Sequence, residues 1–525
     1  MSSVSEYLEN TLMECGGFGR FQIIHICIVL VSKISITWSL IMMAFAGATP
    51  DWWCQSANLD SNATGSGFWN MTSGLYSKSC SVKLNGSSQA CPSKNFDSNM
   101  NTIVSEWELV CDKKWVTATI STIQMAGLLV SGFLSGQFAD VIGRKPTFFG
   151  ALFIMSFANI LAGFSSSWIM FAVMRFFIGL GCGMYVTVYC NYQIEFTPTK
   201  YRPLQIAIPD WCIWAAMFGF FSWILHDWAH LHFLTGGITG SFLLSWFFPE
   251  SFRWLVSNGK IEEASIIIKR IAKMNGRPVP NLDSLKSVVE HDVSLIQGKK
   301  YIFLDVFRHW EQVRRTILLG VGWLSCGYGY YAIYYGVDQL TGNIYLNLFL
   351  LSVVDIPATI ALWGLQNWIG RRWTCFGFFI IGFISTMCVA IAQLISIDDN
   401  LRGQLINGFA LAGKMGVSAA WGAILTYTVE LYPTVIRNMG FGLQNSIARI
   451  GAMIAPQIIL ISMDTAGVMY FVCSAMMLLS AICSLMLPET KGKTIPDTLE
   501  TEEKSSSQKE IDMNEVTKLN SDVNC

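Results

Sequence analysis

Two charged side chains stand inside segments that are otherwise apolar enough to cross a membrane. Arg449 lies near the centre of GFGLQNSIARIGAMIAPQIILIS, and Asp210 lies within LQIAIPDWCIWAAMFGFF. A charge at the middle of a bilayer costs about 2.5–3.5 kcal/mol on insertion scales, so such residues commonly mark a substrate or ion pathway. A guanidinium binds carboxylates, whereas a carboxylate attracts organic or coupling cations. The two residues therefore predict a binding site for small organic ions; a structural ion pair between them is the alternative.

Aromatic residues accompany both charges. Trp323 and Tyr330 lie two helical turns apart in GWLSCGYGYYAIYYG, and Tyr185 and Tyr189 share i, i+4 spacing in another apolar segment. Trp214 lies one turn after the interior acid. An aromatic face attracts an organic cation by about 0.5–2 kcal/mol. We expect these rings to line the site, with ordinary packing as the alternative, because most membrane aromatics serve that purpose.

The composition indicates a polytopic membrane protein. Of the 525 residues, 52% are hydrophobic and only 14% are charged, well below the roughly 25% of ordinary soluble domains. The net charge of −1 and the absence of a basic cluster argue against nucleic acid as a partner. Apolar runs of about 20 residues recur, each long enough to span a bilayer, so the lipid bilayer is the expected environment.

The pattern of apolar runs predicts an all-α membrane protein with twelve transmembrane helices in two halves. The helices are expected at 21–45, 115–138, 147–164, 168–194, 204–225, 230–248, 315–336, 345–366, 374–394, 404–427, 440–462 and 466–487. The corresponding parts are an N-terminal segment 1–20, a first half 21–248, a central loop 249–314, a second half 315–487 and a tail 488–525 whose Ser/Lys/Glu-rich composition predicts disorder.

Charge placement and one long loop predict the orientation. Lys and Arg gather on alternate connections and in the central loop, which places these segments and both termini in the cytoplasm. The loop 48–114 on the opposite side contains the three glycosylation sequons, at Asn62, Asn70 and Asn85. It also contains Cys54, Cys80, Cys91 and Cys111, which predict two disulfides with three possible connectivities. Glycosylation and disulfides both require the lumenal or extracellular face, and the plasma membrane is the expected location.

A short motif repeats in the two halves. The second helix ends in GQFADVIGRKP, with Asp140, Gly143 and Arg144, and the eighth ends in LQNWIGRRW, with Gly370 and Arg371. Glycine permits a tight turn at each helix end, and two parallel halves are a signature of major facilitator proteins. We expect a conformational latch at these turns; simple topology anchors are the alternative.

A second repeat follows the fourth and tenth helices. Glu195 precedes Arg202 with the same spacing that separates Glu430 from Arg437. This E-x6-R repeat predicts paired contacts at a cytoplasmic gate. Lys414, in LAGKMG, is expected to be a structural or gating charge as well.

Longer motifs give the chain a family resemblance. It resembles the organic cation/anion/carnitine transporters, solute carrier family 22 of the major facilitator superfamily. The matching motifs are GGFGRFQ, TIVSEWELVCDKKW, FADVIGRKP, IEFTPTKYR, PESFRWL, GNIYLNLFLLSVVDIPA, NWIGRR, GKMG, VELYPTVIRNMG and LPETKG. The chain departs from the family at Phe252, where proline is usual, and at Asn367, which stands where the first half has Asp140.

The resemblance implies a secondary transporter that works by alternating access. It places Arg449 and Asn445 on a cavity-facing helix, and it implies an arginine there in anion- and carnitine-transporting members. Thr359 stands where anion-transporting members often have a second cation, so a carnitine-like zwitterion or organic cation is the first expectation. An organic-anion exchanger using Arg449 is the alternative, and a non-transporting receptor or scaffold is a remote one.

No catalytic, cofactor or metal-binding motif is evident. GLGCG lies in an apolar helix and follows no strand, so its glycines predict close helix packing rather than a phosphate site. We therefore expect no enzyme activity and no cofactor. A coupled sodium ion, proton or exchanged anion stays open, as does the oligomeric state.

Overall fold

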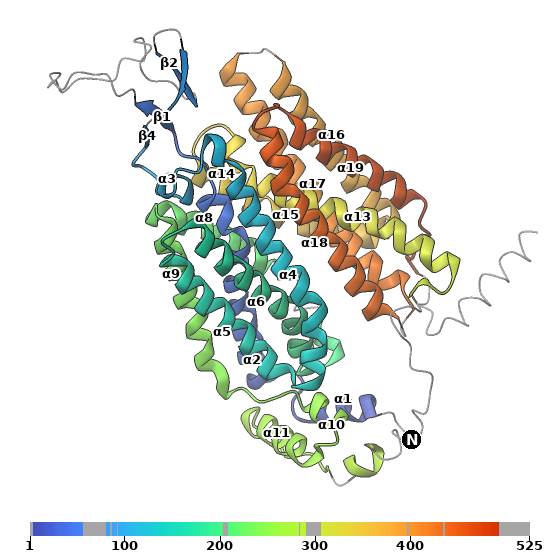
Figure 1. Cartoon of the computed structure of the whole chain (residues 1–525). Helices are drawn as coiled ribbons and strands as arrows, with labels where there is room; N and C mark the ends of the chain where they lie inside the picture. The colour runs from blue at the N-terminus through green and yellow to red at the C-terminus, as the bar shows by residue number, and fades with distance from the viewer. Residues whose placement is uncertain are drawn as a thin grey trace, which may run out of the picture.

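The structure is a computed structural model. It describes residues 4–55, 80–84, 87–91, 93–202, 208–282, 284–289, 306–395, 398–433 and 436–492. Figure 1 shows two bundles of long helices side by side, blue to green for the first half and yellow to red for the second. Strands β1–β4 lie at one end of the molecule, hereafter the disulfide end, and α1, α10 and α11 lie at the opposite, N-terminal end.

The first half comprises six spans. They are α2 (Arg20–Ala46), α4 (Trp115–Val141), α5 (Arg144–Gly163), α6 (Trp168–Glu195), α8 (Asp210–Leu225) and α9 (Trp228–Ser241), which continues as the 3₁₀ segment η3 (Phe242–Phe247). The start of α8 differs from the expected residue 204: the described helix begins at Asp210, directly after Pro209, and residues 203–207 lie outside the described residues.

The second half has the same number of spans. They are α13 (Trp310–Tyr335), α14 (Ile344–Val353) with α15 (Asp355–Trp368), α16 (Arg371–Leu394), α17 (Asp399–Leu431), α18 (Arg437–Ser462) and α19 (Val468–Leu485). The expected helix 345–366 is present as one span, Ile344–Trp368, whose regular helix is interrupted at the single residue Val354. Pro357 explains the interruption, since proline has no N–H and its ring crowds the carbonyl four residues earlier.

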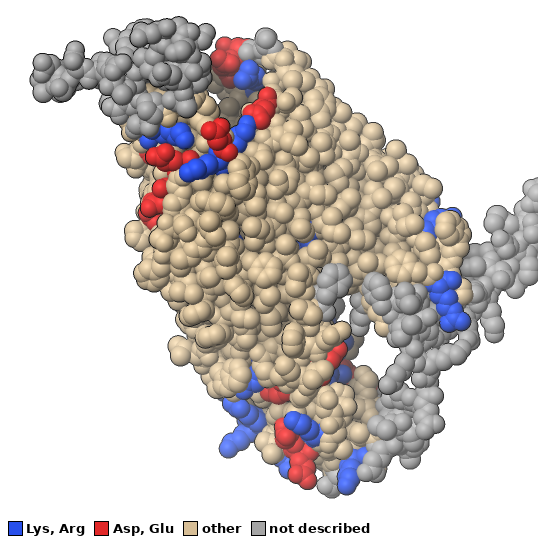
Figure 2. Space-filling view, viewed as in Figure 1, with Lys and Arg blue, Asp and Glu red and all other residues tan. Residues whose placement is uncertain are grey.

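The described helices fit a bilayer. By length and composition, nine helices in the described part of the chain are apolar enough to cross a membrane, and α8 is a shorter apolar helix. Together with α9–η3 and α13 they account for the twelve predicted spans. The distribution of charge on the surface also fits a bilayer. Figure 2 shows that Lys, Arg, Asp and Glu gather at the two ends, and that the visible surface between them is almost free of charge.

Small elements cover both ends. At the disulfide end β1 (Trp52–Gln55) pairs with β4 (Ser93–Phe96), β2 (Ser81–Leu84) pairs with β3 (Ser87–Ala90), and α3 (Ile103–Glu106) leads toward α4. The predicted pair of disulfides is present, as Cys54–Cys91 and Cys80–Cys111. The three sequons and most of the tail lie outside the described residues. The opposite end carries α1 (Val4–Glu14), α10 (Phe252–Ser257) and α11 (Ile261–Met274).

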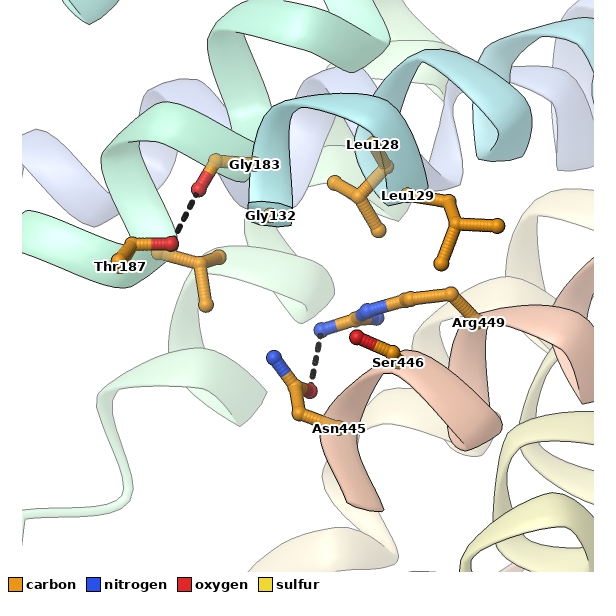
Figure 3. A pocket seen from close by; sticks show the side chains of 9 residues that line it. Leu128, Leu129, Gly132, Gly183, Thr187, Asn445, Ser446 and Arg449 are labelled. Atoms are coloured by element: carbon orange, nitrogen blue, oxygen red, sulfur yellow. Dashed lines mark hydrogen bonds between the residues drawn. The ribbon is translucent and has the colours of Figure 1, made fainter. Parts of the chain in front are cut away.

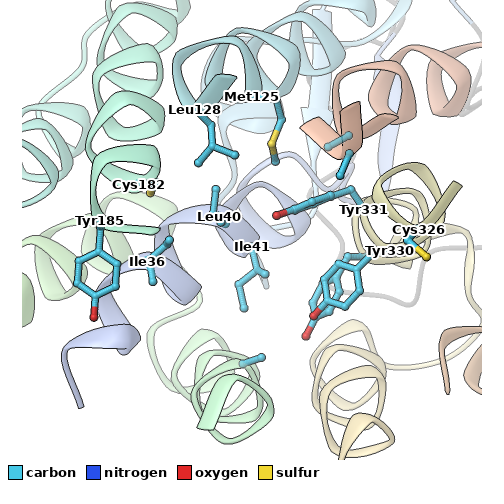
Figure 4. Packing of buried hydrophobic residues seen from close by; sticks show 14 of the residues in the cluster. Ile36, Leu40, Ile41, Met125, Leu128, Cys182, Tyr185, Cys326, Tyr330 and Tyr331 are labelled. Atoms are coloured by element: carbon cyan, nitrogen blue, oxygen red, sulfur yellow. The ribbon is translucent and has the colours of Figure 1, made fainter. Parts of the chain in front are cut away.

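Glycines bring the helices close, as GLGCG predicts. A Cβ on Gly179 of α6 would lie 2.0 Å from the Gln124 carbonyl oxygen of α4. The second half repeats this contact, because a Cβ on Gly327 of α13 would lie 2.0 Å from the Ala448 carbonyl of α18. These close contacts hold α6 against α4 in the first half and α13 against α18, the helix that carries Arg449, in the second half. Figure 4 shows the apolar centre that results, with Ile41 and Leu128 of the first half near the tyrosines of α13.

The two halves are joined at and near the disulfide end. Thr122 of α4 donates to the Met453 carbonyl of α18 at 3.2 Å and accepts a hydrogen bond from Gln457 at 2.9 Å. Tyr335 of α13 donates to the Leu40 carbonyl of α2 at 2.9 Å. The ribbons of the two halves diverge toward the N-terminal end (Figure 1). The molecule is therefore closed between its halves at the disulfide end.

Candidate functional site

Arg449 lies in a pocket between the halves. It stands midway along α18, and its side chain extends toward α4 (Figure 3). The pocket region contains about 260 Å³ of space between side chains, part of which is open to solvent. Its lining consists of Leu128, Leu129, Gly132, Gly183, Val186, Thr187, Asn445, Ser446 and Arg449. In space, these residues lie between the Thr122–Met453 contact and the N-terminal end of the molecule. The contact therefore separates the pocket from the disulfide end.

The guanidinium of Arg449 has no acidic partner. It donates to the Asn445 side-chain oxygen at 3.3 Å and to the Tyr331 hydroxyl at 3.4 Å, both of which are neutral. Within the described residues, no Asp or Glu oxygen lies within 4 Å of it. The expected proximity of Asn445 and Arg449 is thus present. Their geometry offers a positive charge and an amide to an anionic group, and an oxygen acid could replace the weak neutral contacts.

Asp210 does not pair with Arg449, which corrects one of the sequence-based alternatives. Its carboxylate lies 2.7 Å from the Nζ of Lys33 on α2, and both side chains are largely buried, at 12% and 13% exposure. The ring of Tyr189 lies beneath the same ammonium, 4.8 Å from its centre. The charge of Asp210 is therefore already neutralised by a lysine of the same half.

A second neutral pair lies in the other half. Lys414 of α17 donates to both carboxylate oxygens of Asp355 at 2.9 and 2.7 Å, and the side chains are 0% and 5% exposed. Ser418 accepts from the ammonium and donates to the carboxylate. Tyr330 stacks over the ammonium at 3.7 Å, and Trp211 of the first half donates to the Tyr330 hydroxyl at 2.6 Å. Tyr330 thus lies at the junction of the halves, and its ring already faces a protein cation; its predicted role in substrate binding stays a prediction.

The other aromatic residues are held by contacts within their own halves. Trp323 is buried and donates to Thr428 at 2.9 Å. Tyr185 is fully buried; its hydroxyl lies 2.6 Å from that of Ser32, and its ring stacks on Tyr189 with centroids 5.3 Å apart. Trp214 donates to the Leu30 carbonyl at 3.1 Å. None of these rings lines the Arg449 pocket, so the structure does not assemble the predicted aromatic wall around Arg449.

The repeated Gly-Arg turns have the same geometry in both halves. Gly143 and Gly370 have positive φ angles of 119° and 96°, which explains the need for glycine. Arg144 donates through Nε to Glu195 at 3.1 Å, and Arg371 donates through Nε to Glu430 at 3.0 Å. Each glutamate lies in the last turn of a helix of the same half, Glu195 in α6 and Glu430 in α17, so each Gly-Arg turn is tied within its own half.

A further glutamate caps the helix that starts at each turn. The backbone N–H of Arg144 donates to Glu250 at 3.1 Å, and that of Arg371 donates to Glu489 at 2.9 Å. Asp140 adds a 2.7 Å contact to Arg144 for which Asn367 offers no charged counterpart. These caps explain why α5 and α16 begin three residues earlier than expected.

The predicted gate pairs have different partners. Arg202 lies 3.7 Å from Glu9 of α1 rather than beside Glu195. Arg437 donates to the Tyr432 carbonyl at 3.4 Å, while Glu430 binds Arg371 and Thr490. The two glutamates of the E-x6-R repeat therefore contact the arginines of the Gly-Arg turns, Arg144 and Arg371, rather than the arginines of the repeat itself.

Sequence reasoning missed three charged residues. Lys33 and Asp355 interrupt apolar runs just as Arg449 does, and the same criterion could have found both. Arg175 of α6 is fully buried over the ring of Phe171 and donates to Gln124. No group of three His, Cys, Asp or Glu side chains that could hold a metal ion occurs in the part of the chain that the structure describes.

Twelve spans in two similar halves, joined around a charged pocket, define a membrane transporter of the major facilitator fold. The family model described as Sugar (and other) transporter matches residues 28–500. The partially occluded inward open structure of the xylose transporter XylE from E. coli has a TM-score of 0.59 at 14% identity, covering 90% of this chain and 99% of that one. A crystal structure of a D-xylose-proton symporter gives 0.61 at 14% identity, with the same coverages.

Sequence relatives narrow the class. The chain is 31% identical over 412 residues to the organic cation/carnitine transporter 2 of Homo sapiens, covering 77% of this chain and 72% of that protein. It is 28% identical over 510 residues to the organic anion transporter 3 of Mus musculus, covering 92% of each. The chain belongs to solute carrier family 22, as its motifs predict.

Proposed function

We propose that this protein transports small organic ions that carry a carboxylate, which binds to Arg449. The main support for this proposal is that the Arg449 guanidinium lines a pocket between the halves and has no acidic partner among the described residues. A charge at that depth needs a counter-charge, and a carboxylate matches its paired donors. The names of two relatives mention organic cations and carnitine in one case and organic anions in the other, and carnitine carries a carboxylate.

The charge balance favours anions over cations. Lys33 neutralises Asp210 and Lys414 neutralises Asp355, so neither acid offers a free negative charge to an organic cation. We therefore place a carboxylate-bearing anion before the carnitine-like zwitterion or organic cation that the sequence suggested first. A carnitine-like zwitterion stays the second candidate, because the carboxylate of such a molecule could also bind Arg449.

Transport is proposed to proceed by alternating access at the plasma membrane. The contacts of Thr122 and Tyr335 close the disulfide end, which we assign to the cell exterior because disulfides form there. In the opposite state these contacts would separate and Arg449 would face the exterior. The Arg144–Glu195 and Arg371–Glu430 pairs would keep the ends of each half rigid while the halves rock.

Uptake of labelled 4-hydroxybenzoate and labelled carnitine into cells that express the protein tests the proposal. Arg449→Gln should reduce carboxylate uptake about a hundredfold, because losing one partner of a desolvated charge pair costs about 2–5 kcal/mol. Arg449→Lys should retain part of the activity. Arg402→Gln removes one positive charge from an exposed site on α17 and should leave uptake unchanged.

Thermal unfolding of the purified variants separates binding from folding. Arg449→Gln should unfold within a few degrees of the unmodified protein, because its guanidinium has only neutral partners. Undiminished uptake of both carboxylates by stable Arg449→Gln protein would refute the proposal. Uptake of carnitine but not of 4-hydroxybenzoate by the unmodified protein would favour the zwitterion candidate.

A further inference from the structure

A second pocket lies at the disulfide end, on the other side of the closure from Arg449. It contains about 420 Å³ of space between the ends of four helices, part of which is open to solvent. The lining residues are Met43, Gly47, Lys114, Thr117, Ala118, Ser121, Tyr335, Asp338, Pro456, Ile459, Leu460 and Met463. They come from α2 and α4 in the first half and from the α13 and α18 regions in the second.

The charged residues of this pocket leave one carboxylate without a counter-charge. Lys114 pairs with Asp464, which follows α18. Asp338 lies in the 3₁₀ turn after α13 and is exposed to solvent. Across the described residues, no Lys, Arg or His nitrogen lies within 4 Å of the Asp338 carboxylate. The pocket thus has an available negative charge, whereas the Arg449 pocket has an available positive one.

The remaining lining indicates the kind of ligand. Met43, Ile459, Leu460 and Met463 offer apolar surface, and Tyr335 adds an aromatic ring. A carboxylate beside apolar and aromatic groups suits a cation with hydrophobic substituents. The carboxylate offsets the cost of removing water from the positive charge, and the apolar groups contact the substituents. We propose that this pocket binds a small organic cation, such as an aryl-substituted quaternary ammonium, with Asp338 as its counter-charge.

Binding there would favour one conformation. Because the lining comes from both halves, the pocket is complete only while the disulfide ends are held together, as by Tyr335 and Leu40. A ligand that binds one of two conformations shifts the population toward it. The bound cation would therefore stabilise the state that is closed at the disulfide end, and it would act from the side opposite to the proposed Arg449 site.

Thermal unfolding of the purified full-length protein tests this inference without relying on transport. Benzyltrimethylammonium chloride is titrated against sodium chloride of equal ionic strength. A saturable rise in the unfolding midpoint is expected, because a ligand that binds only the folded state stabilises it. Asp338→Asn should weaken the apparent affinity at least about tenfold, since it removes the counter-charge. Thr117→Phe, which fills the pocket without changing its charge, should weaken it as well.

Two matched variants make the result specific. Asp399→Asn removes one negative charge from the start of α17, where the carboxylate is 97% exposed, and should leave the response intact. Arg449→Gln should also leave it intact, which separates this pocket from the proposed transport site. Absence of a midpoint shift in the unmodified protein, or an equal shift in Asp338→Asn, would overturn the inference. Neither result would bear on whether Arg449 binds carboxylates.

Discussion

The two lysine pairs and the Arg449 pocket present a positive charge within the helix bundles in opposite ways: the lysines are largely or fully buried, whereas Arg449 is partly exposed. Lys33 and Lys414 each lie 2.7 Å from a carboxylate of their own half. Arg449 has only an amide and a hydroxyl, at 3.3 and 3.4 Å. A charge whose partner belongs to the same half can keep that partner in every conformation, whereas an unpaired charge between the halves can exchange water for a ligand, which is the role proposed for Arg449. We therefore propose that the lack of an acidic partner, rather than the charge alone, marks a binding residue in this protein.

The strongest test of this comparison removes a partner. Asp355→Asn leaves Lys414 fully buried without a counter-charge, and breaking a buried pair in this way costs about 3–5 kcal/mol. We expect a large fall in the thermal unfolding midpoint of the purified protein. The double variant Asp355→Leu, Lys414→Met should regain most of the loss, because apolar replacements remove both charges. An unchanged midpoint for Asp355→Asn would show that the pair is not structural.

The Lys33–Asp210 pair should respond less strongly. Its side chains are 13% and 12% exposed, so water reaches the charge that is left after substitution. We expect Asp210→Asn to cost about 1–2 kcal/mol, between the values for exposed and buried pairs. The charge swap Lys33→Asp, Asp210→Lys should restore part of that stability. If the stable swapped variant loses carboxylate uptake, the pair takes part in transport and the distinction drawn here fails.

Most of the fold could be predicted because it depends on local patterns. Apolar runs mark the spans, and Gly143 and Gly370 mark the turns, where positive φ angles require glycine. The differences are local as well. Pro357 interrupts the eighth span, and Glu250 and Glu489 extend α5 and α16 by capping their first N–H groups. Capping residues that are distant in sequence leave no signal near the helix they cap.

The site was less predictable because it depends on which distant residues meet. Arg449 and Asn445 are one turn apart on α18, and their contact follows from helical spacing. The partner of Asp210 belongs to another helix, and the sequence suggested only Arg449 as an ion-pair partner. The packing of α2 against α8 decides in favour of Lys33. Spacing predicts neighbours on one helix, but only the packed structure pairs charges between helices.

The two capping glutamates extend the comparison to charges in equivalent positions. Glu489 accepts hydrogen bonds from the N–H groups of Arg371, Arg372, Thr490 and Lys491. Partial burial opposes ionisation there, but these donors outweigh it and lower the pKa of Glu489. Burial instead raises the pKa of Glu250, and the nearby Glu195 adds to the effect despite three backbone donors. The equivalent cap therefore favours the ionised form of Glu489 in the second half and disfavours the ionised form of Glu250 in the first half.

Substitution by glutamine should reveal this difference as the smallest of the expected effects. Near neutral pH, Glu489→Gln should cost about 1 kcal/mol of stability, the usual value of a helix cap, and Glu250→Gln should cost less. A lowered pKa contributes stability above the ordinary pKa of the group, which is lost as the pH falls through the folded value. A raised pKa contributes stability at low pH, which is lost as the pH rises through the folded value. The deficit of Glu489→Gln should therefore shrink in acid while that of Glu250→Gln grows, and unfolding midpoints with parallel pH profiles would contradict the assignment of partners to the two caps.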